Sequence, residues 1–294
     1  MSPLFLAMPG NEAMTARLAA AVGGDIGACE VGSFPDGEAH VRVAANPQGR
    51  SVALVCTLSH PDDKFLRLVF AADTLRELGA NRVGLVAPYL AYMRQDRRFH
   101  PGEAVTSAIF ARLISRSFDW LATVDPHLHR HKSLEEIYSI PCLALHAGSA
   151  IAEWIERNIE RPFLIGPDGE SRQWVAAVAA ACGADYSILE KRRLGDRSVT
   201  VDASRIQIPP QTTPVLIDDI VSSGATMIEA MAAVRQKTPA SAVSIAVHML
   251  GDPSLATALE KTGVRLVTTN TIPWESGLID ITPILVTGLG ALIS

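Results

Sequence analysis

The feature that most constrains the fold is a repeated alternation of short apolar segments with segments of helical periodicity. We expect strands at Leu4–Met8, Val52–Thr57, Arg82–Ala87, Trp120–Val124, Pro162–Gly166, Tyr186–Leu189, Pro214–Ile217, Ala242–His248 and Val264–Thr268. Apolar residues at three-to-four spacing predict helices at Lys64–Leu78, Ala104–Arg116, Gln173–Cys182 and Thr226–Gln236. Apolar strands that alternate with helices are typical of parallel sheets covered on both faces.

The alternation runs twice, with a seam near Pro141–Ser149. A chain of 294 residues is also long enough for two domains of about 150 residues each. We therefore predict an α/β fold with two similar doubly wound parallel-sheet domains. The first covers residues 1–143 and is joined by a C-terminal helix at 283–294, and the second covers residues 144–282.

Two segments depart from the alternation. Cys29–Val43 has alternating residues on both sides of a Pro-Asp-Gly turn, which predicts a hairpin. Arg192–Ile208 is rich in arginine and ends before Pro209-Pro210, which predicts a mobile flap.

Composition excludes several classes. The net charge is −5 with no long run of either sign, which argues against nucleic-acid binding. Apolar residues make up 48% and charged residues 19%, so the chain buries much of itself or covers its surface with a copy of itself. No apolar run approaches the roughly 20 residues that span a bilayer, and the first residues show no secretory pattern. We expect a cytoplasmic protein without a membrane partner.

The four cysteines, Cys29, Cys56, Cys142 and Cys182, are widely spaced and form no CxxC pair. They favour reduced thiols over a zinc site or a disulfide framework.

The strongest local signal is the segment from Asp218 to Thr226, DDIVSSGAT, at the end of an apolar strand. Backbone N–H groups of Ser222–Thr226 would converge at a helix N-terminus and form an anion site. The two aspartates before them can accept hydrogen bonds from vicinal sugar hydroxyls. The segment resembles the phosphoribosyl-pyrophosphate loop of the phosphoribosyltransferase superfamily.

Two further segments suit a nucleotide. Arg94–Arg98, RQDRR, follows a predicted strand, where arginine can bind phosphate or stack on a base. Phe34–Glu38, FPDGE, offers an aromatic ring and two carboxylates on one turn, which would suit adenine. Alone, the second segment indicates only a turn.

Three segments suit metal and phosphoryl chemistry. His127, His129 and His131 alternate after a predicted strand, and we favour one of them in a magnesium or phosphate site and the others at the surface. Asp168 also follows a strand and can hold a metal through oxygen or water. The cationic segment Glu190–Arg193 begins the predicted flap and could neutralise charge during phosphoryl transfer.

Together these motifs resemble the ribose-phosphate diphosphokinases, or phosphoribosyl pyrophosphate synthetases, over nearly the whole chain. The resemblance includes FPDGE, RQDR, DPH, PDG, KRR, DDIVSSGAT and the late Thr269–Pro273, TNTIP. It implies two phosphoribosyltransferase-like domains and transfer of the β,γ-diphosphate of ATP to the anomeric hydroxyl of ribose 5-phosphate, with release of AMP. It also implies a homo-oligomer, at least a dimer, because the family lends its FPDGE hairpin to a neighbouring subunit's ATP site.

The resemblance carries roles to particular positions. For ATP binding these are Phe34, Asp36, Glu38, Arg94, Gln95 and Arg97. For ribose 5-phosphate they are Asp218, Asp219, Ser222, Ser223, Gly224, Ala225 and Thr226. For Mg²⁺ they are His127 and Asp168, and for stabilising the transition state they are Lys191 and Arg193.

The chain departs from the commoner members of the family at some positions. Ser222 stands where they carry a third acidic residue, and Pro126 gives DPH where they have DLH. Both features resemble the archaeal-type branch. Glu170 adds a carboxylate beside Asp168, at a position that is glycine-rich in the family.

Two other functions remain open from the residues alone. A phosphoribosyltransferase that consumes the activated sugar would need the Ser222–Thr226 loop but not FPDGE, RQDR or KRR. A regulatory homologue without catalysis would be expected to lose catalytic cations or loop residues, which are all present here.

Overall fold

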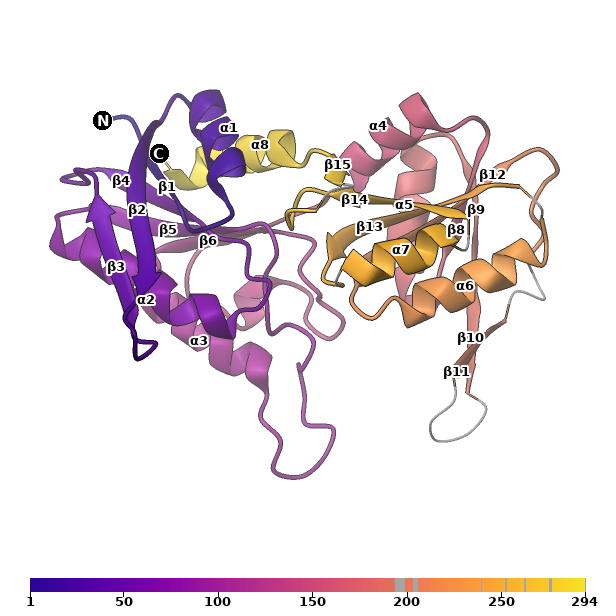
Figure 1. Cartoon of the computed structure of the whole chain (residues 1–294), viewed down its shortest axis with the longest axis horizontal. Coiled ribbons are helices and arrows are strands. Elements are labelled where there is room, and N and C mark those ends of the chain that lie inside the picture. Colours follow the sequence, from indigo (N-terminus) through magenta and orange to yellow (C-terminus); the bar gives the residue numbers. More distant parts are fainter. Residues whose placement is uncertain are drawn as a thin grey trace. The chain divides into compact units, whose positions relative to one another are not determined.

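The computed structural model describes residues 1–193, 199–202, 206–238, 240–251, 253–261, 263–274 and 277–293. The chain divides into two compact units (Figure 1). Unit 1 comprises residues 1–146 and 282–294, and unit 2 comprises residues 147–281.

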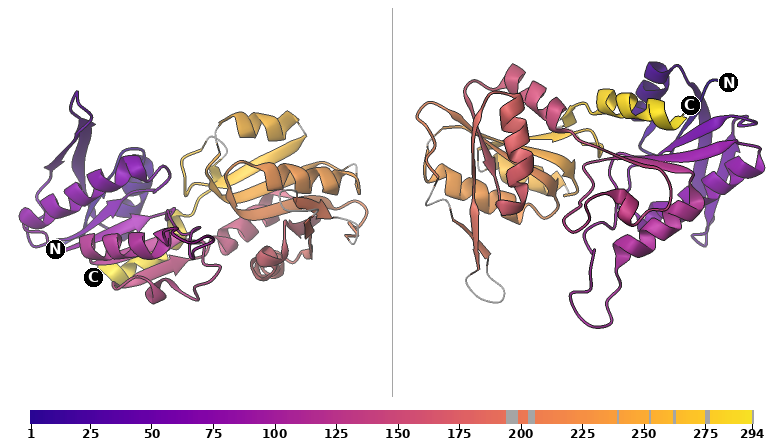
Figure 2. Two further views of the ribbon diagram at one scale, coloured as in Figure 1. Left: turned by 90° about the horizontal axis from the view of Figure 1, so that it is seen from below. Right: turned by 180° about the vertical axis from the view of Figure 1, so that it is seen from behind.

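Unit 1 is built on a seven-stranded sheet of order β3-β2-β1-β4-β5-β6-β7. The strands are β1 (Leu4–Ala7), β2 (Asp25–Ser33), β3 (Ala39–Ala44), β4 (Ser51–Val55), β5 (Arg82–Ala87), β6 (Trp120–Val124) and β7 (Cys142–Leu145). All neighbours are parallel except β2 and β3, which form an antiparallel hairpin that stands out from the sheet (Figure 2). The β2–β3 hairpin is therefore the one antiparallel pair among the described strands of this otherwise parallel sheet.

Helices cover both faces of this sheet. α1 (Glu12–Val22) packs beside the C-terminal α8 (Thr282–Ile293), and α2 (Asp62–Glu77) packs beside α3 (Thr106–Ser117). A short 3-10 turn, η1 (Leu134–Glu136), precedes β7. Strands β4, β5 and β6 are buried almost throughout, as expected for strands that are apolar on both faces.

Unit 2 is built on a six-stranded parallel sheet of order β15-β14-β13-β12-β8-β9. Its strands are β8 (Pro162–Gly166), β9 (Asp185–Ile188), β12 (Thr213–Val221), β13 (Ala242–Met249), β14 (Val264–Thr269) and β15 (Gly277–Ile279). A separate antiparallel pair consists of β10 (Glu190–Arg193) and β11 (Val199–Asp202).

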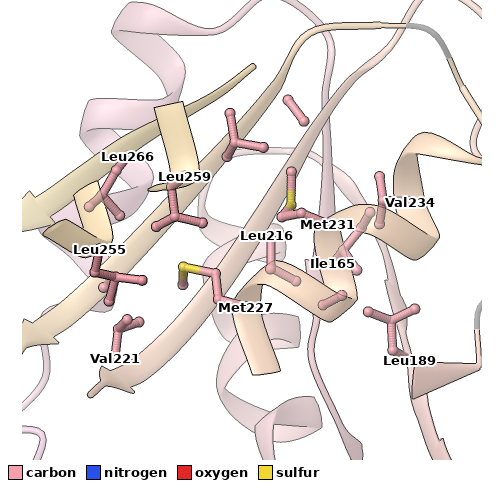
Figure 3. Close-up of a cluster of buried hydrophobic side chains, with 14 of the residues drawn as sticks. Ile165, Leu189, Leu216, Val221, Met227, Met231, Val234, Leu255, Leu259 and Leu266 are labelled. Atoms are coloured by element: carbon pink, nitrogen blue, oxygen red, sulfur yellow. The ribbon is translucent and has the colours of Figure 1, made fainter. Parts of the chain in front are cut away.

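The helices of unit 2 also lie on both faces of its sheet. α4 (Gly148–Asn158) packs beside α5 (Arg172–Ala181), while α6 (Ala225–Arg235) and α7 (Pro253–Lys261) lie on the other side (Figure 1). A 3-10 turn, η2 (Gly169–Ser171), leads into α5. Figure 3 shows the apolar cluster under α6 and α7, in which Met227 and Leu255 pack near Val221 and Leu216 of β12.

The predicted fold class is confirmed. Each of the nine predicted strands overlaps an observed strand, and the Pro-Asp-Gly turn does connect an antiparallel hairpin. The predicted seam contains a strand that was not expected from the sequence, β7 (Cys142–Leu145), which is short and only half-buried. The predicted flap overlaps β10 and β11, and its residues 194–198 and 203–205 lie outside the described part of the chain. Among the described residues, no helix combines the length and apolar character that crossing a bilayer requires.

Candidate active site

The strand order of unit 2 predicts a ligand site between β8 and β12. The chain leaves β8 for β9 on one side of it, and later returns to β12 on the other side. In open parallel sheets, ligands bind at the carboxyl ends of the strands where the strand order reverses. Asp168 follows β8, and Asp218 and Asp219 lie near the end of β12, so three predicted site residues lie at this point.

Asp218 lies close enough to Asp219 and Asp168 for their charges to act on it. Burial, followed by the negative charges of Asp219 and Asp168, raises the pKa of Asp218 well above its ordinary value. Backbone hydrogen bonds fix their orientation: Asp218 Oδ1 accepts from Asp219 N at 3.0 Å, and Asp219 Oδ1 accepts from Ile220 N at 2.8 Å. Asp168 Oδ1 accepts from Glu170 N at 3.0 Å, at the start of η2. The cluster is a concentration of negative charge, which a bound cation or hydrogen bonds from sugar hydroxyls would stabilise.

The loop after β12 is shaped for an anion. Gly224 stands at the N-terminal end of α6 with φ of 72°, and Ile228 N donates to its carbonyl at 2.8 Å. Ser222 and Ser223 precede it, while Ala225 and Thr226 form the first turn of α6, whose N–H groups have no partner within the helix. The structure therefore gathers Ser222–Thr226 beside the aspartates, at a helix N-terminus suited to phosphate.

Two residues that sequence reasoning missed support this loop. A Cβ on Gly224 would lie 2.2 Å from Leu255 Cδ1, so the loop lies directly against the buried Leu255 side chain. A Cβ on Gly251 would lie 2.8 Å from the carbonyl oxygen of Ser222. Since Leu255 and Gly251 come from the segment after β13, only tertiary structure connects them to the loop.

In unit 1, three residues with a strained backbone lie at the carboxyl edge of the sheet. His60, Tyr92 and Asp125 follow β4, β5 and β6 and have φ of 50°, 61° and 37°. Such conformations cost about 1–3 kcal/mol each and gather at functional sites. The Tyr92 hydroxyl donates a hydrogen bond to the Asp62 carboxylate, which raises the pKa of Tyr92 to about 12.

The arginine loop after β5 carries the predicted nucleotide residues. Arg94 and Arg97 are exposed and Gln95 is half-buried, with the Arg97 guanidinium 5.1 Å from the centre of the Phe99 ring. The Asp96 side chain is only 3% exposed, and both of its oxygens accept from Arg130 Nη1, at 2.8 and 2.9 Å. Asp96 therefore joins this loop to the histidine loop after β6, a link that the sequence motif does not reveal.

The three histidines after β6 have different surroundings. His127 Nδ1 lies 3.1 Å from His129 Nε2, with ring centres 3.7 Å apart. His131 Nδ1 instead lies 3.1 Å from Glu136 Oε2. His127 lies in unit 1 and Asp168 in unit 2.

The hairpin residues lie apart from the arginine loop within unit 1. Phe34, 51% exposed, stands at the hairpin tip with Asp36 and Glu38, where Phe34 N donates to the Glu38 carbonyl at 2.8 Å. Strands β1 and β4 lie between β2 and β5, so the roots of the two loops are separated by about 15 Å of sheet. Lys191 and Arg193 belong to β10, and their side chains lie outside the described part of the structure.

Comparisons with known proteins agree with this arrangement. The sequence model of the N-terminal domain of ribose phosphate pyrophosphokinase matches residues 4–117, and that of the phosphoribosyl transferase domain matches residues 133–281. The ribose-phosphate pyrophosphokinase of Methanopyrus kandleri is 34% identical over 261 residues, 87% of this chain and 88% of the relative. That of Saccharolobus solfataricus is 35% identical over 247 residues, 81% of this chain and 82% of the relative.

A solved structure shows the same fold. The phosphoribosylpyrophosphate synthetase from Mycobacterium smegmatis superposes with a TM-score of 0.84 at 19% identity, covering 99% of both chains. The chain is thus an enzyme built from two units of the phosphoribosyltransferase type. It belongs to the ribose-phosphate pyrophosphokinase family. This confirms the predicted resemblance, and places the chain among the transferases and kinases of nucleotide biosynthesis.

Enzymes of this family need a divalent metal ion. The described residues fit one, because the cluster of Asp168, Asp218 and Asp219 offers the oxygen ligands that hard cations prefer. Burial and then the charges of Asp219 and Asp168 raise the pKa of Asp218, and a bound cation would offset the repulsion among these carboxylates.

Proposed function

We propose that this enzyme transfers the β,γ-diphosphate of ATP to the C1 hydroxyl of ribose 5-phosphate. The C1 oxygen attacks the β-phosphorus, the bond between that phosphorus and the oxygen bridging to the α-phosphate breaks, and AMP leaves with the bonding electrons. The hydroxyl proton passes to solvent. The observation that carries the proposal is the placement of paired aspartates and a phosphate-shaped loop at the switch point of a chain that belongs to this family.

Unit 2 would bind the sugar. The first-turn N–H groups around Ser222, Ser223, Gly224, Ala225 and Thr226 suit the 5-phosphate, because they satisfy an anion without a counter-charge. Asp218 and Asp219 would accept hydrogen bonds from the ribose hydroxyls, with their carboxylates oriented by the backbone N–H groups that donate to each Oδ1 atom.

Unit 1 would bind the nucleotide. Arg94, Gln95 and Arg97 would contact the phosphates and base from the loop after β5. Phe34, Asp36 and Glu38 would bind adenine in a neighbouring subunit, a role supported by the projecting hairpin and by the two strands that separate it from the arginine loop (Figure 2). We propose the functional domains as residues 1–143 with 283–294, and residues 144–282.

The metal would be Mg²⁺, held by His127 and Asp168, and it would supply charge neutralisation at the transferring diphosphate. Lys191 and Arg193 would stabilise the charge that develops in the transition state. Four free cysteines fit a reducing cytoplasm as the place of action.

Incubating the protein with ATP, Mg²⁺ and ribose 5-phosphate should yield AMP in proportion to the sugar added. AMP should be absent without the sugar or without the metal. A transferase that consumes the activated sugar would form no AMP from these substrates, and a regulatory homologue would form no product. ADP and inorganic phosphate as the nucleotide products would contradict the proposal.

The protein is also proposed to be a homo-oligomer, with α2 and α3 as one contact face. Leu66, Ile109 and Leu113 are 55%, 40% and 40% exposed and line one apolar hollow of about 350 Å³ between these helices. Exposed apolar surface of this kind is typical of interaction sites, and two-fold symmetry would let the face pack on its own copy.

Replacing both Leu66 and Leu113 with glutamate should therefore lower the molar mass measured by light scattering. Leu278→Glu is the control, since Leu278 is 51% exposed on β15 of unit 2. A wild-type protein that scatters as a 31.4 kDa monomer while fully active would contradict the assembly.

A further inference from the structure

The loop that carries His127 begins at a strained residue. Asp125, the first residue after β6, has φ of 37°, a backbone conformation that residues other than glycine seldom adopt. Such a residue persists only when its surroundings over-determine it. The groups that hold Asp125 therefore decide where His127, two residues later, is placed.

Two contacts from the end of β7 hold this residue. The backbone N–H of Asp125 donates to the Leu145 carbonyl at 2.8 Å, and Asp125 Oδ1 lies 2.9 Å from His146 Nδ1. The Asp125 side chain is only 9% exposed, so its carboxylate depends on protein partners. The His146 side chain is 75% exposed and so is not held there by packing in the core.

We propose that His146 is a positioning residue for the metal–nucleotide site: by donating a hydrogen bond to Asp125, it locks the strained turn that presents His127. This inference rests on the proposed function, in which His127 holds the metal. His146 does not itself touch metal or substrate. It acts only through Asp125, as an outer partner that fixes the direction of a ligand-bearing loop.

The electrostatics agree with this geometry. The hydrogen bond to Asp125 raises the pKa of His146 above its ordinary value. A nuclear magnetic resonance titration should therefore find the His146 pKa raised in the wild-type protein and lowered again by Asp125→Asn. An unperturbed His146 in the wild-type protein would overturn the proposal, because the pair would then not form in solution.

The functional test compares two replacements at position 146. His146→Ala removes the donor, whereas His146→Asn keeps an N–H group where Nδ1 stood. Direct partners of metal-binding histidines change metal affinity or activity about 10–100-fold. His146 acts on His127 only through Asp125, so its effect should be smaller. We expect His146→Ala to weaken metal binding about threefold to tenfold relative to the wild type, and His146→Asn to bind the metal almost as well as the wild type.

Mn²⁺ binding gives a readout that does not depend on turnover. The free Mn²⁺ signal in electron paramagnetic resonance is followed during titration, in the presence of a non-hydrolysable ATP analogue. In the kinetic assay, the metal concentration for half-maximal rate should rise in the same proportion. The KM for ribose 5-phosphate should stay unchanged, because that site lies in unit 2.

Three further results would overturn the proposal: equal Mn²⁺ affinity for His146→Ala and wild type, no rescue by His146→Asn, or a KM for ribose 5-phosphate that rises as much as the half-maximal metal concentration. The last result would indicate general loosening of the fold. A wild-type protein that forms no AMP would instead contradict the proposed function, while the titration of His146 and the Mn²⁺ comparison would still decide the role of His146.

Discussion

Gly224→Ala is expected to lower kcat/KM for ribose 5-phosphate more than about 100-fold, because a displacement of about 1 Å at a positioned group can cost that much. Gly224 has φ of 72°, and a methyl group there would lie 2.2 Å from Leu255 Cδ1 and 3.0 Å from Leu255 Cγ. Leu255 is buried in the apolar cluster of unit 2, so we expect the loop to shift instead of this side chain. That shift displaces the N–H groups that we assign to the 5-phosphate.

A matched control separates the contact from the backbone strain. Gly183 has φ of 64° with nothing within 4 Å of its ideal Cβ, so Gly183→Ala carries the strain of about 1–2 kcal/mol without the contact. Activity in that variant should be nearly unchanged. Adding Leu255→Ala to Gly224→Ala should recover part of the lost sugar affinity, measured by calorimetry. Equal sugar affinity in Gly224→Ala and wild type would contradict the assigned loop.

Asp218→Asn is expected to weaken binding of ribose 5-phosphate about 10- to 100-fold while stabilising the fold at neutral pH. The loss follows from removing a charged acceptor for sugar hydroxyls, worth about 1.5–3 kcal/mol. The gain follows from the raised pKa of Asp218, caused by burial and by the charges of Asp219 and Asp168. Holding this carboxylate ionised beside two others opposes folding, and the neutral amide removes that cost.

The pH dependence tests the sign of this effect. Because the folded-state pKa of Asp218 is raised, the wild type is relatively most stable below the unfolded-state pKa of about 3.9 and loses stability as the pH rises from there. The melting temperature of Asp218→Asn should therefore exceed that of the wild type at pH 8 and match it near pH 3.

The expected rise at pH 8 is a few degrees, since 1 kcal/mol shifts melting by about 2–4 °C in domains of 150–250 residues. Asp185→Asn is the control, because Asp185 is exposed at the start of β9. It should change neither the melting temperature nor sugar binding. A lower melting temperature for Asp218→Asn at pH 8 would contradict the electrostatic account of the cluster.

The alternation of strands and helices was predictable because buried parallel strands must be apolar on both faces. β5, β6 and β8 have the bounds expected from the sequence. β7 was missed because its four residues are all half-buried and resemble a linker. The hairpin was predictable from its turn chemistry alone, since Pro35-Asp36-Gly37 specifies a tight reversal.

The candidate site was predictable only as separate motifs. Asp218, Asp219 and the Ser222–Thr226 segment are contiguous, so local chemistry indicates their role. Asp96–Arg130 and Asp125–His146 join residues that lie 34 and 21 positions apart, and neither pair has a local pattern. Leu255 supports the phosphate loop from a different helix for the same reason. Residues that hold a site in place are set by tertiary contacts, which one sequence does not display.

In the proposed reaction, the C1 oxygen of ribose 5-phosphate attacks the β-phosphorus of ATP. Ribose 5-phosphate labelled with ¹⁸O at C1 tests this directly, with the product examined by phosphorus magnetic resonance. We expect the label to be retained in the oxygen that bridges C1 and the diphosphate, with one AMP formed for each molecule of product. Loss of the label from that bridge, or ADP as the nucleotide product, would contradict it.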